Sequence, residues 1–309
     1  MTVIAASAAL FRILDAATLQ WQVDQQYRSA VELRVATRVA GDLARVALLL
    51  LEAGALWFAA AMVLEAMVGS LILFVRTRPE FAGLLSASRS FSKPLLRQGL
   101  PVVVSGLVSA MYARFDQLTI SRVLGPEVNG SYAAAVRISE IFTIFAVSIG
   151  SVALPLLSAE QQRPVFERRI VQYMRLMLIA GILIAAGVSI LADEIVQLLY
   201  GARYASAGAI LATHVWTVPL IFASVATEPW FYQQGRVSLY VFKATIGLGF
   251  CIPAVLLAME HWGPSGVALA VVLTYFTSVF MTNLVLPSAR PLLRLQLEAA
   301  FGWRTGDRR

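Results

Sequence analysis

The chain contains little of what soluble enzymes and metalloproteins are built from. Only 14% of its 309 residues are charged, whereas a soluble domain is about one quarter charged. Its single cysteine, Cys251, excludes a disulfide within the chain and a cysteine-based metal site. The only two histidines, His214 and His261, lie too far apart in the sequence to suggest a pair of ligands. We therefore expect no metal and no cofactor.

Motifs of common catalysts are absent as well. The sequence has no GxxxxGK[ST] phosphate loop, no GxSxG nucleophile motif and no HExxH zinc motif. The first residues lack the basic start of a signal peptide, and Arg12 and Asp15 interrupt the first apolar run. We expect that the protein is not an enzyme.

Long apolar runs dominate what is present. Hydrophobic residues make up 59% of the chain, and its mean hydropathy is +0.74. A stretch of ~20 apolar residues crosses a bilayer as a helix, because a helix satisfies its own backbone hydrogen bonds. We predict an all-α, polytopic membrane helix bundle with nine spans, at residues 2–19, 35–51, 55–75, 99–120, 132–156, 174–191, 205–226, 237–259 and 263–286.

The basic residues are distributed unevenly about these spans. If residues 76–98 are cytoplasmic, the alternation of nine spans places 18 of the 25 Lys and Arg residues on the cytoplasmic side. Only Arg122 and Arg203 then lie outside, and the other five lie within spans. Cytoplasmic loops of membrane proteins carry such an excess. The pattern predicts a multi-pass protein of the cytoplasmic (inner) membrane with its C-terminus in the cytoplasm. It also accounts for the net charge of +7 without nucleic acid as a partner.

Two blocks of spans are separated by a basic segment. We predict that this segment (76–98) and the connection 159–173 lie at the membrane surface, because both mix apolar with basic residues. Gly125 and Pro126 are expected to end the fourth span, and Asn129 to cap the fifth. The predicted domains are a partial N-terminal lobe of three spans (1–75), a cytoplasmic amphipathic linker (76–98), a C-terminal lobe of six spans (99–287) and a basic cytoplasmic tail (288–309).

Seven of the ionisable residues inside predicted spans are candidate site residues. A charge at mid-bilayer costs about 2.5–3.5 kcal/mol on insertion scales, so such charges face one another or a hydrated cavity. A cavity inside a helix bundle is a candidate binding site. The seven are Arg38, Asp42 and Arg45 in the second span, Arg114 and Asp116 in the fourth, and Arg137 and Glu140 in the fifth.

The charges of the second span lie on one face. At 100° per residue, Arg38, Asp42 and Arg45 fall within one polar stripe. This stripe fits either an amphipathic surface helix with local ion pairs or one wall of a cationic cavity.

The charges of the fourth and fifth spans differ in their expected partners. Arg114 and Asp116 point in nearly opposite directions, so each needs a partner from another helix or from water, although an arginine can also extend to the outer interface. Arg137 and Glu140 are three residues apart and can pair with each other. The three spans together offer four arginines and three acids, which suits an anionic or pyrophosphate-bearing ligand.

Four segments in the second block resemble a known family. Residues 112–118 (YARFDQL), 124–140 (LGPEVNGSYAAAVRISE), 199–204 (LYGARY) and 263–270 (GPSGVALA) are similar to the polysaccharide-biosynthesis flippase family. That family moves lipid-linked oligosaccharides and belongs to the multidrug/oligosaccharidyl-lipid/polysaccharide exporter superfamily. The resemblance implies two six-helix lobes facing each other across a cavity of alternating opening. It also implies that the N-terminal lobe of this chain lacks about three spans.

The resemblance implies a flippase that translocates a lipid-linked oligosaccharide across the cytoplasmic membrane by alternating access. Its expected partners are a polyprenyl-pyrophosphate-linked glycan, membrane lipids and other polysaccharide-assembly proteins. The substrate phosphates or acidic sugars would contact the four arginines, Arg38, Arg45, Arg114 and Arg137. Charge balance or ion coupling would fall to the three acids, Asp42, Asp116 and Glu140. Three alternatives stay open: a multidrug or small-molecule antiporter of the same superfamily, a non-transporting scaffold, and a polymerase or glycosyltransferase in a glycan-assembly complex.

Overall fold

The structure is a computed structural model that describes residues 27–85 and 114–302, and every regular element in these two ranges is helical. The chain divides into two compact units, Met1–Gln98 (unit 1) and Gly99–Arg309 (unit 2). The prediction of an all-α helix bundle is confirmed. The predicted span at 2–19 and most of that at 99–120 lie outside the described residues.

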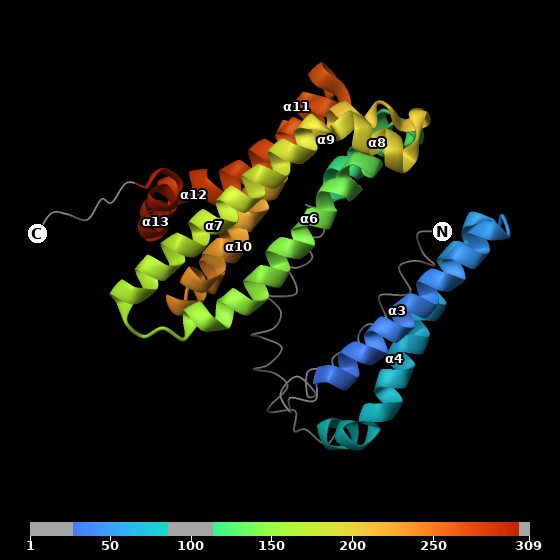
Figure 1. Ribbon diagram of the computed structural model, residues 1–309, viewed down its shortest axis with the longest axis horizontal. Helices are drawn as coiled ribbons and strands as arrows, with labels where there is room; N and C mark the ends of the chain where they lie inside the picture. Colours follow the sequence, from blue (N-terminus) through green and yellow to red (C-terminus); the bar gives the residue numbers. More distant parts are fainter. Residues whose placement is uncertain (1–26, 86–113, 303–309) are drawn as a thin grey trace, which may run out of the picture. The chain divides into compact units, whose positions relative to one another are not determined.

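Unit 1 is described as two helices, α3 (Tyr27–Leu50) and α4 (Ala55–Leu85), which pack against each other (Figure 1). The apolar stretch Leu56–Ile72 of α4 corresponds to the predicted third span. The helix continues to Leu85 without a break. Residues 76–85 of the predicted linker are therefore part of the same helix as the third span, and their predicted place at the membrane surface stays a prediction.

Unit 2 contains four helical segments that are long and apolar enough to cross a membrane. They span residues 126–158, 163–190, 207–233 and 245–285, and their presence agrees with the prediction of a polytopic membrane protein. The elements of this unit, after a helix at residues 114–123, are α6 (Pro126–Ser158), α7 (Arg163–Ile190), α8 (Ala192–Tyr200), η2 (Ala202–Tyr204), α9 (Ala207–His214), α10 (Thr217–Gln233), α11 (Val237–Phe276), η3 (Thr277–Met281), α12 (Thr282–Val285), η4 (Pro287–Ala289) and α13 (Arg290–Phe301).

Two of the glycines with positive φ lie where helices of unit 2 change direction. Gly125 (φ 93°) precedes Pro126, the first residue of α6, whose fixed φ suits that position. The prediction that Asn129 caps this helix is wrong, because the helix is already one turn long there. Gly263 (φ 60°) interrupts α11, and Pro264 restarts the helix. The predicted connection at 260–262 is itself helical, and the break falls one residue later.

The basic end of unit 2 is helical. Because α7 begins at Arg163, residues 163–173 of the predicted connection belong to the same helix as the span that follows. The predicted tail from 288 begins in η4 and continues as the short helix α13, which packs against α7.

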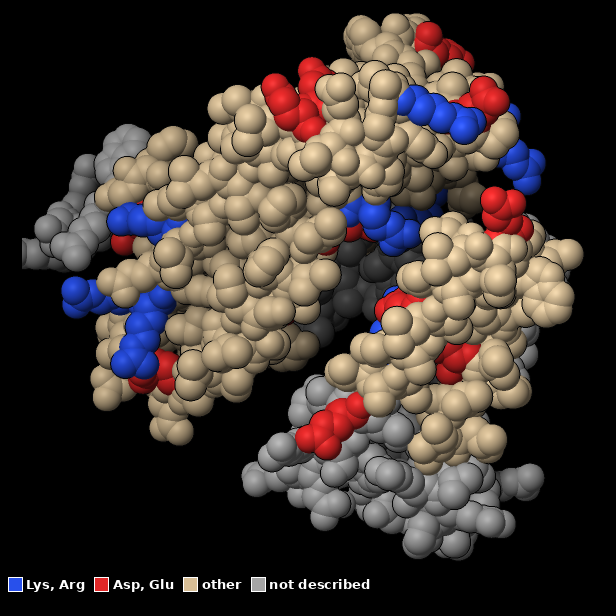
Figure 2. Space-filling model, turned by 45° about the vertical axis from the view of Figure 1, so that its right-hand side comes forward, with Lys and Arg blue, Asp and Glu red and all other residues tan. Residues whose placement is uncertain are grey.

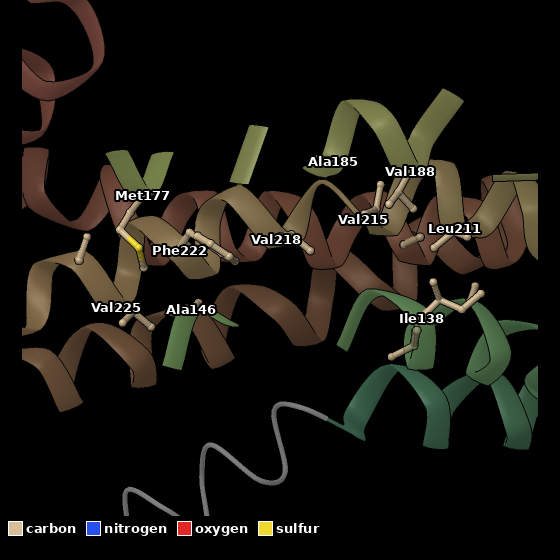
Figure 3. Packing of buried hydrophobic residues seen from close by; sticks show 14 of the residues in the cluster. Ile138, Ala146, Met177, Ala185, Val188, Leu211, Val215, Val218, Phe222 and Val225 are labelled. Atoms are coloured by element: carbon tan, nitrogen blue, oxygen red, sulfur yellow. The ribbon is translucent and has the colours of Figure 1, made fainter. Parts of the chain in front are cut away.

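The core of unit 2 lies where α10 packs against α7, α6 and α11. Phe222 and Val225 of α10 lie beside Met177 of α7 and Ala146 of α6 (Figure 3). Gly181 allows α7 and α10 to pack closely: a Cβ atom at this position would lie 2.6 Å from the Cα atom of Pro219. Small residues at such positions let helix backbones approach each other within a membrane.

We expect the substitution Gly181→Ala to lower the free energy of unfolding by about 1–3 kcal/mol, the usual cost of overpacking. The added methyl group meets the backbone of α10, which cannot turn aside as a flexible side chain would. The matched control is Gly187→Ala in the same helix, where a Cβ atom meets nothing within 4 Å. Thermal unfolding of both variants in one detergent checks this. Equal melting temperatures would contradict the close contact between α7 and α10.

Candidate functional site

The first charged cluster joins the two helices of unit 1. The Glu65 carboxylate of α4 accepts from Arg45 Nη1 at 2.7 Å and lies 3.5 Å from Arg38 Nη1. Asp42 pairs with the same two arginines, at 2.5 Å from Arg45 and 3.9 Å from Arg38. Gly41 belongs to this contact, because a Cβ atom there would overlap the Glu65 carboxylate. The polar stripe of α3 is therefore the face on which α4 packs.

Sequence reasoning missed Glu65, although the sequence carried a signal for it. Glu65 is the only ionisable residue in the predicted span 55–75, and a lone acid in an apolar helix requires a partner. Its side chain is 14% exposed, against 65% for Arg38 and 58% for Asp42. Glu65 is thus the least exposed member of the first cluster.

The second charged cluster joins the helix at 114–123 to α6 in unit 2. Glu140 is its centre: Oε1 lies 3.2 Å from Arg114 Nη1, and Oε2 lies 3.9 Å from Arg137 Nη1. The predicted pairing of Arg137 with Glu140 is therefore present, and Arg114 finds the partner on another helix that its position required. The two arginine side chains are 47% and 71% exposed, so most of their donor groups are accessible to a ligand.

Asp116 follows Arg114 by two residues in the same helix and has a different environment. The residue is 5% exposed, and its Oδ2 accepts a 2.6 Å hydrogen bond from the hydroxyl of Tyr132, which is fully buried. The backbone N–H of Gln117 donates to Oδ1 at 2.7 Å. The Tyr132 ring in turn meets the ring of His214 edge-on, with centroids 6.2 Å apart. Asp116 is therefore part of the core of unit 2, and its carboxylate is not accessible to a bulky ligand.

Tyr132 is the second residue whose role sequence reasoning missed. Asp116 precedes Gly125 by nine positions, and Tyr132 follows it by seven. Two helices that reverse direction at Gly125 therefore bring these residues to similar depth, since each residue advances a helix by about 1.5 Å. The similar separations of Asp116 and Tyr132 from Gly125 could therefore have predicted their contact.

The second cluster lies well inside α6. Arg137 and Glu140 follow Pro126 by about 16 and 21 Å at 1.5 Å per residue. Residues 141–157, which follow them, include no charged side chain. The charges therefore lie at the border of the uncharged part of a helix long enough to span a membrane, where an unpaired charge is costly.

The acids of the two clusters differ from those predicted. The clusters hold four arginines and three carboxylates, those of Asp42, Glu65 and Glu140. Asp116 lies apart from them in the core. Within residues 27–85 and 114–302, no group of three or more His, Cys, Asp and Glu side chains is arranged to hold a metal ion. What the second cluster offers is a pair of accessible guanidinium groups that share one carboxylate.

Comparisons with known proteins agree with the sequence resemblance. A family model described as polysaccharide biosynthesis protein matches residues 1–209. Among solved structures, the fold is similar to that of the lipid II flippase MurJ in an inward closed conformation, with a TM-score of 0.72 and 15% identity. The match covers 96% of this chain and 65% of that chain, so this chain spans about two thirds of the length of its structural relative. No curated protein matches.

We expect Tyr132→Phe to lower the free energy of unfolding by about 1.5–3 kcal/mol, because the buried Asp116 carboxylate loses a donor. In an Asp116→Leu background the same substitution should cost almost nothing, since no carboxylate is left unsatisfied. Thermal unfolding of the four proteins of this double-mutant cycle measures the coupling, and Tyr232→Phe at an exposed tyrosine is the control. Additive effects in the cycle would show that the hydrogen bond contributes nothing.

Proposed function

The chain belongs to the polysaccharide biosynthesis protein family, and from this premise we propose that it acts as a flippase for a lipid-linked polysaccharide precursor. The all-helical fold, which is that of a known lipid flippase, supports this reading. The precursor that suits the site best is a polyprenyl-pyrophosphate-linked glycan, because pyrophosphate is the anionic group common to such carriers and arginine binds phosphate oxygens with two parallel donors.

The observation that carries the proposal is the shared carboxylate of Glu140. Arg114 and Arg137 both pair with it through a single nitrogen, at 3.2 and 3.9 Å, and both remain substantially exposed. An arriving phosphate can therefore bind the remaining guanidinium donors or displace Glu140 without leaving a buried charge unpaired. We assign substrate binding to these two arginines and the exchangeable partner role to Glu140.

Unit 1 carries the other two arginines for which we propose substrate contact, and its cluster is described by itself. Arg38 is 65% exposed and Arg45 is 21% exposed, so we assign Arg38 to the substrate, with Arg45 positioned behind it by Asp42 and Glu65. In an alternating-access cycle two lobes move against each other about the substrate. We propose that residues 1–75 and 99–287 belong to two such lobes, joined by 76–98.

The proposed setting is the inner membrane, with α13 and the C-terminus on the cytoplasmic side. The 18 to 2 distribution of basic residues supports this orientation. A drug antiporter of the same superfamily would need an acidic excess to attract cations, and neither cluster has one.

We expect Arg114→Ala, introduced at the native locus, to reduce surface polysaccharide roughly 10-fold or more, since a hydrogen bond to a charged group contributes about 1.5–3 kcal/mol. Lipid-linked precursor should accumulate on the cytoplasmic face. Surface glycan and extracted precursor are quantified together, and Arg122→Ala on the same helix is the control.

A charge exchange separates substrate binding from a structural role. The double variant Arg114→Glu with Glu140→Arg keeps an ion pair between the two helices but reverses it. If Arg114 binds substrate, this variant folds and does not export. Restored export would assign Arg114 to helix packing alone, and loss of export without precursor accumulation would favour a scaffold.

A further inference from the structure

A basic pocket lies outside the charged clusters. It has a volume of about 1130 Å³ and is lined in unit 2 by the start of α7, the end of α10 and α13, which packs against α7. Basic side chains gather at this end of unit 2, on the left of the view, beside a broad uncharged surface (Figure 2). Six arginines line the pocket: Arg163, Arg168, Arg175, Arg236, Arg290 and Arg294.

The arginines that line this pocket outnumber its carboxylates. Arg175 donates to the backbone carbonyls of Glu298 and Ala299, each at 3.0 Å, and Arg236 donates to the carbonyl of Ser288 at 2.6 Å. A carbonyl satisfies a donor but carries no net charge. The carboxylates of the lining are Glu167, which pairs with Arg163, and Glu298. Six arginines against two glutamates leave an excess of four positive charges.

An apolar groove runs along the other side of α13. It has a volume of about 560 Å³ and shares Arg290, Arg294 and Glu298 with the basic pocket. Its remaining lining is mostly large and apolar: Leu284, Leu293, Leu297 and Phe301. Leu297 is 46% and Phe301 is 76% exposed. Arg290 and Arg294 are four residues apart and therefore lie on one face of α13, between the pocket and the groove.

We infer that this pocket and groove bind an anionic phospholipid of the cytoplasmic leaflet. The phosphate lies against Arg290 and Arg294, and an acyl chain follows the groove past Leu297 to Phe301. Charge complementarity selects an anion, and the adjoining apolar groove selects an amphiphile over a free ion. Basic pockets between helices on the cytoplasmic side suit such headgroups. The inference relies on the proposed membrane orientation but not on flippase activity.

The experiment uses the full chain in detergent and measures lipid retention by native mass spectrometry. The probes are phosphatidylglycerol and phosphatidylcholine of the same acyl chains, and inorganic phosphate is the competitor. We expect phosphatidylglycerol to bind on the order of 10-fold more tightly than phosphatidylcholine, because each arginine near the headgroup adds affinity only for a net anion. Millimolar phosphate should displace little of it.

Two variants locate the site. Arg290→Gln with Arg294→Gln should weaken phosphatidylglycerol binding on the order of 10-fold, and Leu297→Asp should weaken it through the groove. The matched control, Arg122→Gln with Arg203→Gln, removes the same charge at exposed positions outside the pocket and should leave binding unchanged.

Each contrary result overturns the inference. Equal retention of the two lipids by the wild-type protein would exclude selection of an anion. Full displacement by phosphate, with Leu297→Asp binding normally, would assign the pocket to a free anion. Equal weakening by the control pair would reduce the effect to overall charge. Because binding is measured without transport, these outcomes are independent of the export tests of Arg114.

Discussion

A charged side chain in an apolar helix is costly unless a partner compensates it, and in each unit one such partner lies on a neighbouring helix. Glu65 binds α4 to the polar face of α3, and Glu140 binds α6 to the helix at 114–123. The apolar side chains around these contacts are often exposed within the chain, because a membrane rather than a protein core covers them. These polar contacts therefore help to determine which residues of two helices lie opposite each other, in addition to the burial of apolar side chains.

The two kinds of polar contact have different consequences for function. Asp116 and Tyr132 are buried and satisfy each other at 2.6 Å, so separating them would leave a buried carboxylate without its donor. Glu140 is partly exposed and pairs weakly with Arg137, at 3.9 Å. A contact of the first kind maintains the shape of the bundle. A contact of the second kind can exchange partners at low cost, which is what a transient substrate requires.

Local composition was sufficient to predict the helices, whereas the partners of the charged residues depend on tertiary contacts. The apolar runs of α6 and α7 can be recognised from sequence because span length and hydropathy are local properties. The partners of Arg45 and Asp116 could not be recognised in that way, because they depend on which helix lies opposite. Glu65 and Tyr132 each lay in a stretch that was otherwise read as apolar packing.

The basic end of unit 2 shows why the position of a charge matters more than its sign. Arginine side chains at this end could extend freely into water. Arg175 instead binds the backbone carbonyls of Glu298 and Ala299 and joins α7 to α13, and Arg236 binds the carbonyl of Ser288 in η4. Neutral acceptors hold these side chains in place without reducing their charge, so the pocket is both ordered and cationic. A positive surface ordered in this way, next to an apolar groove, is equipped to distinguish one lipid from another.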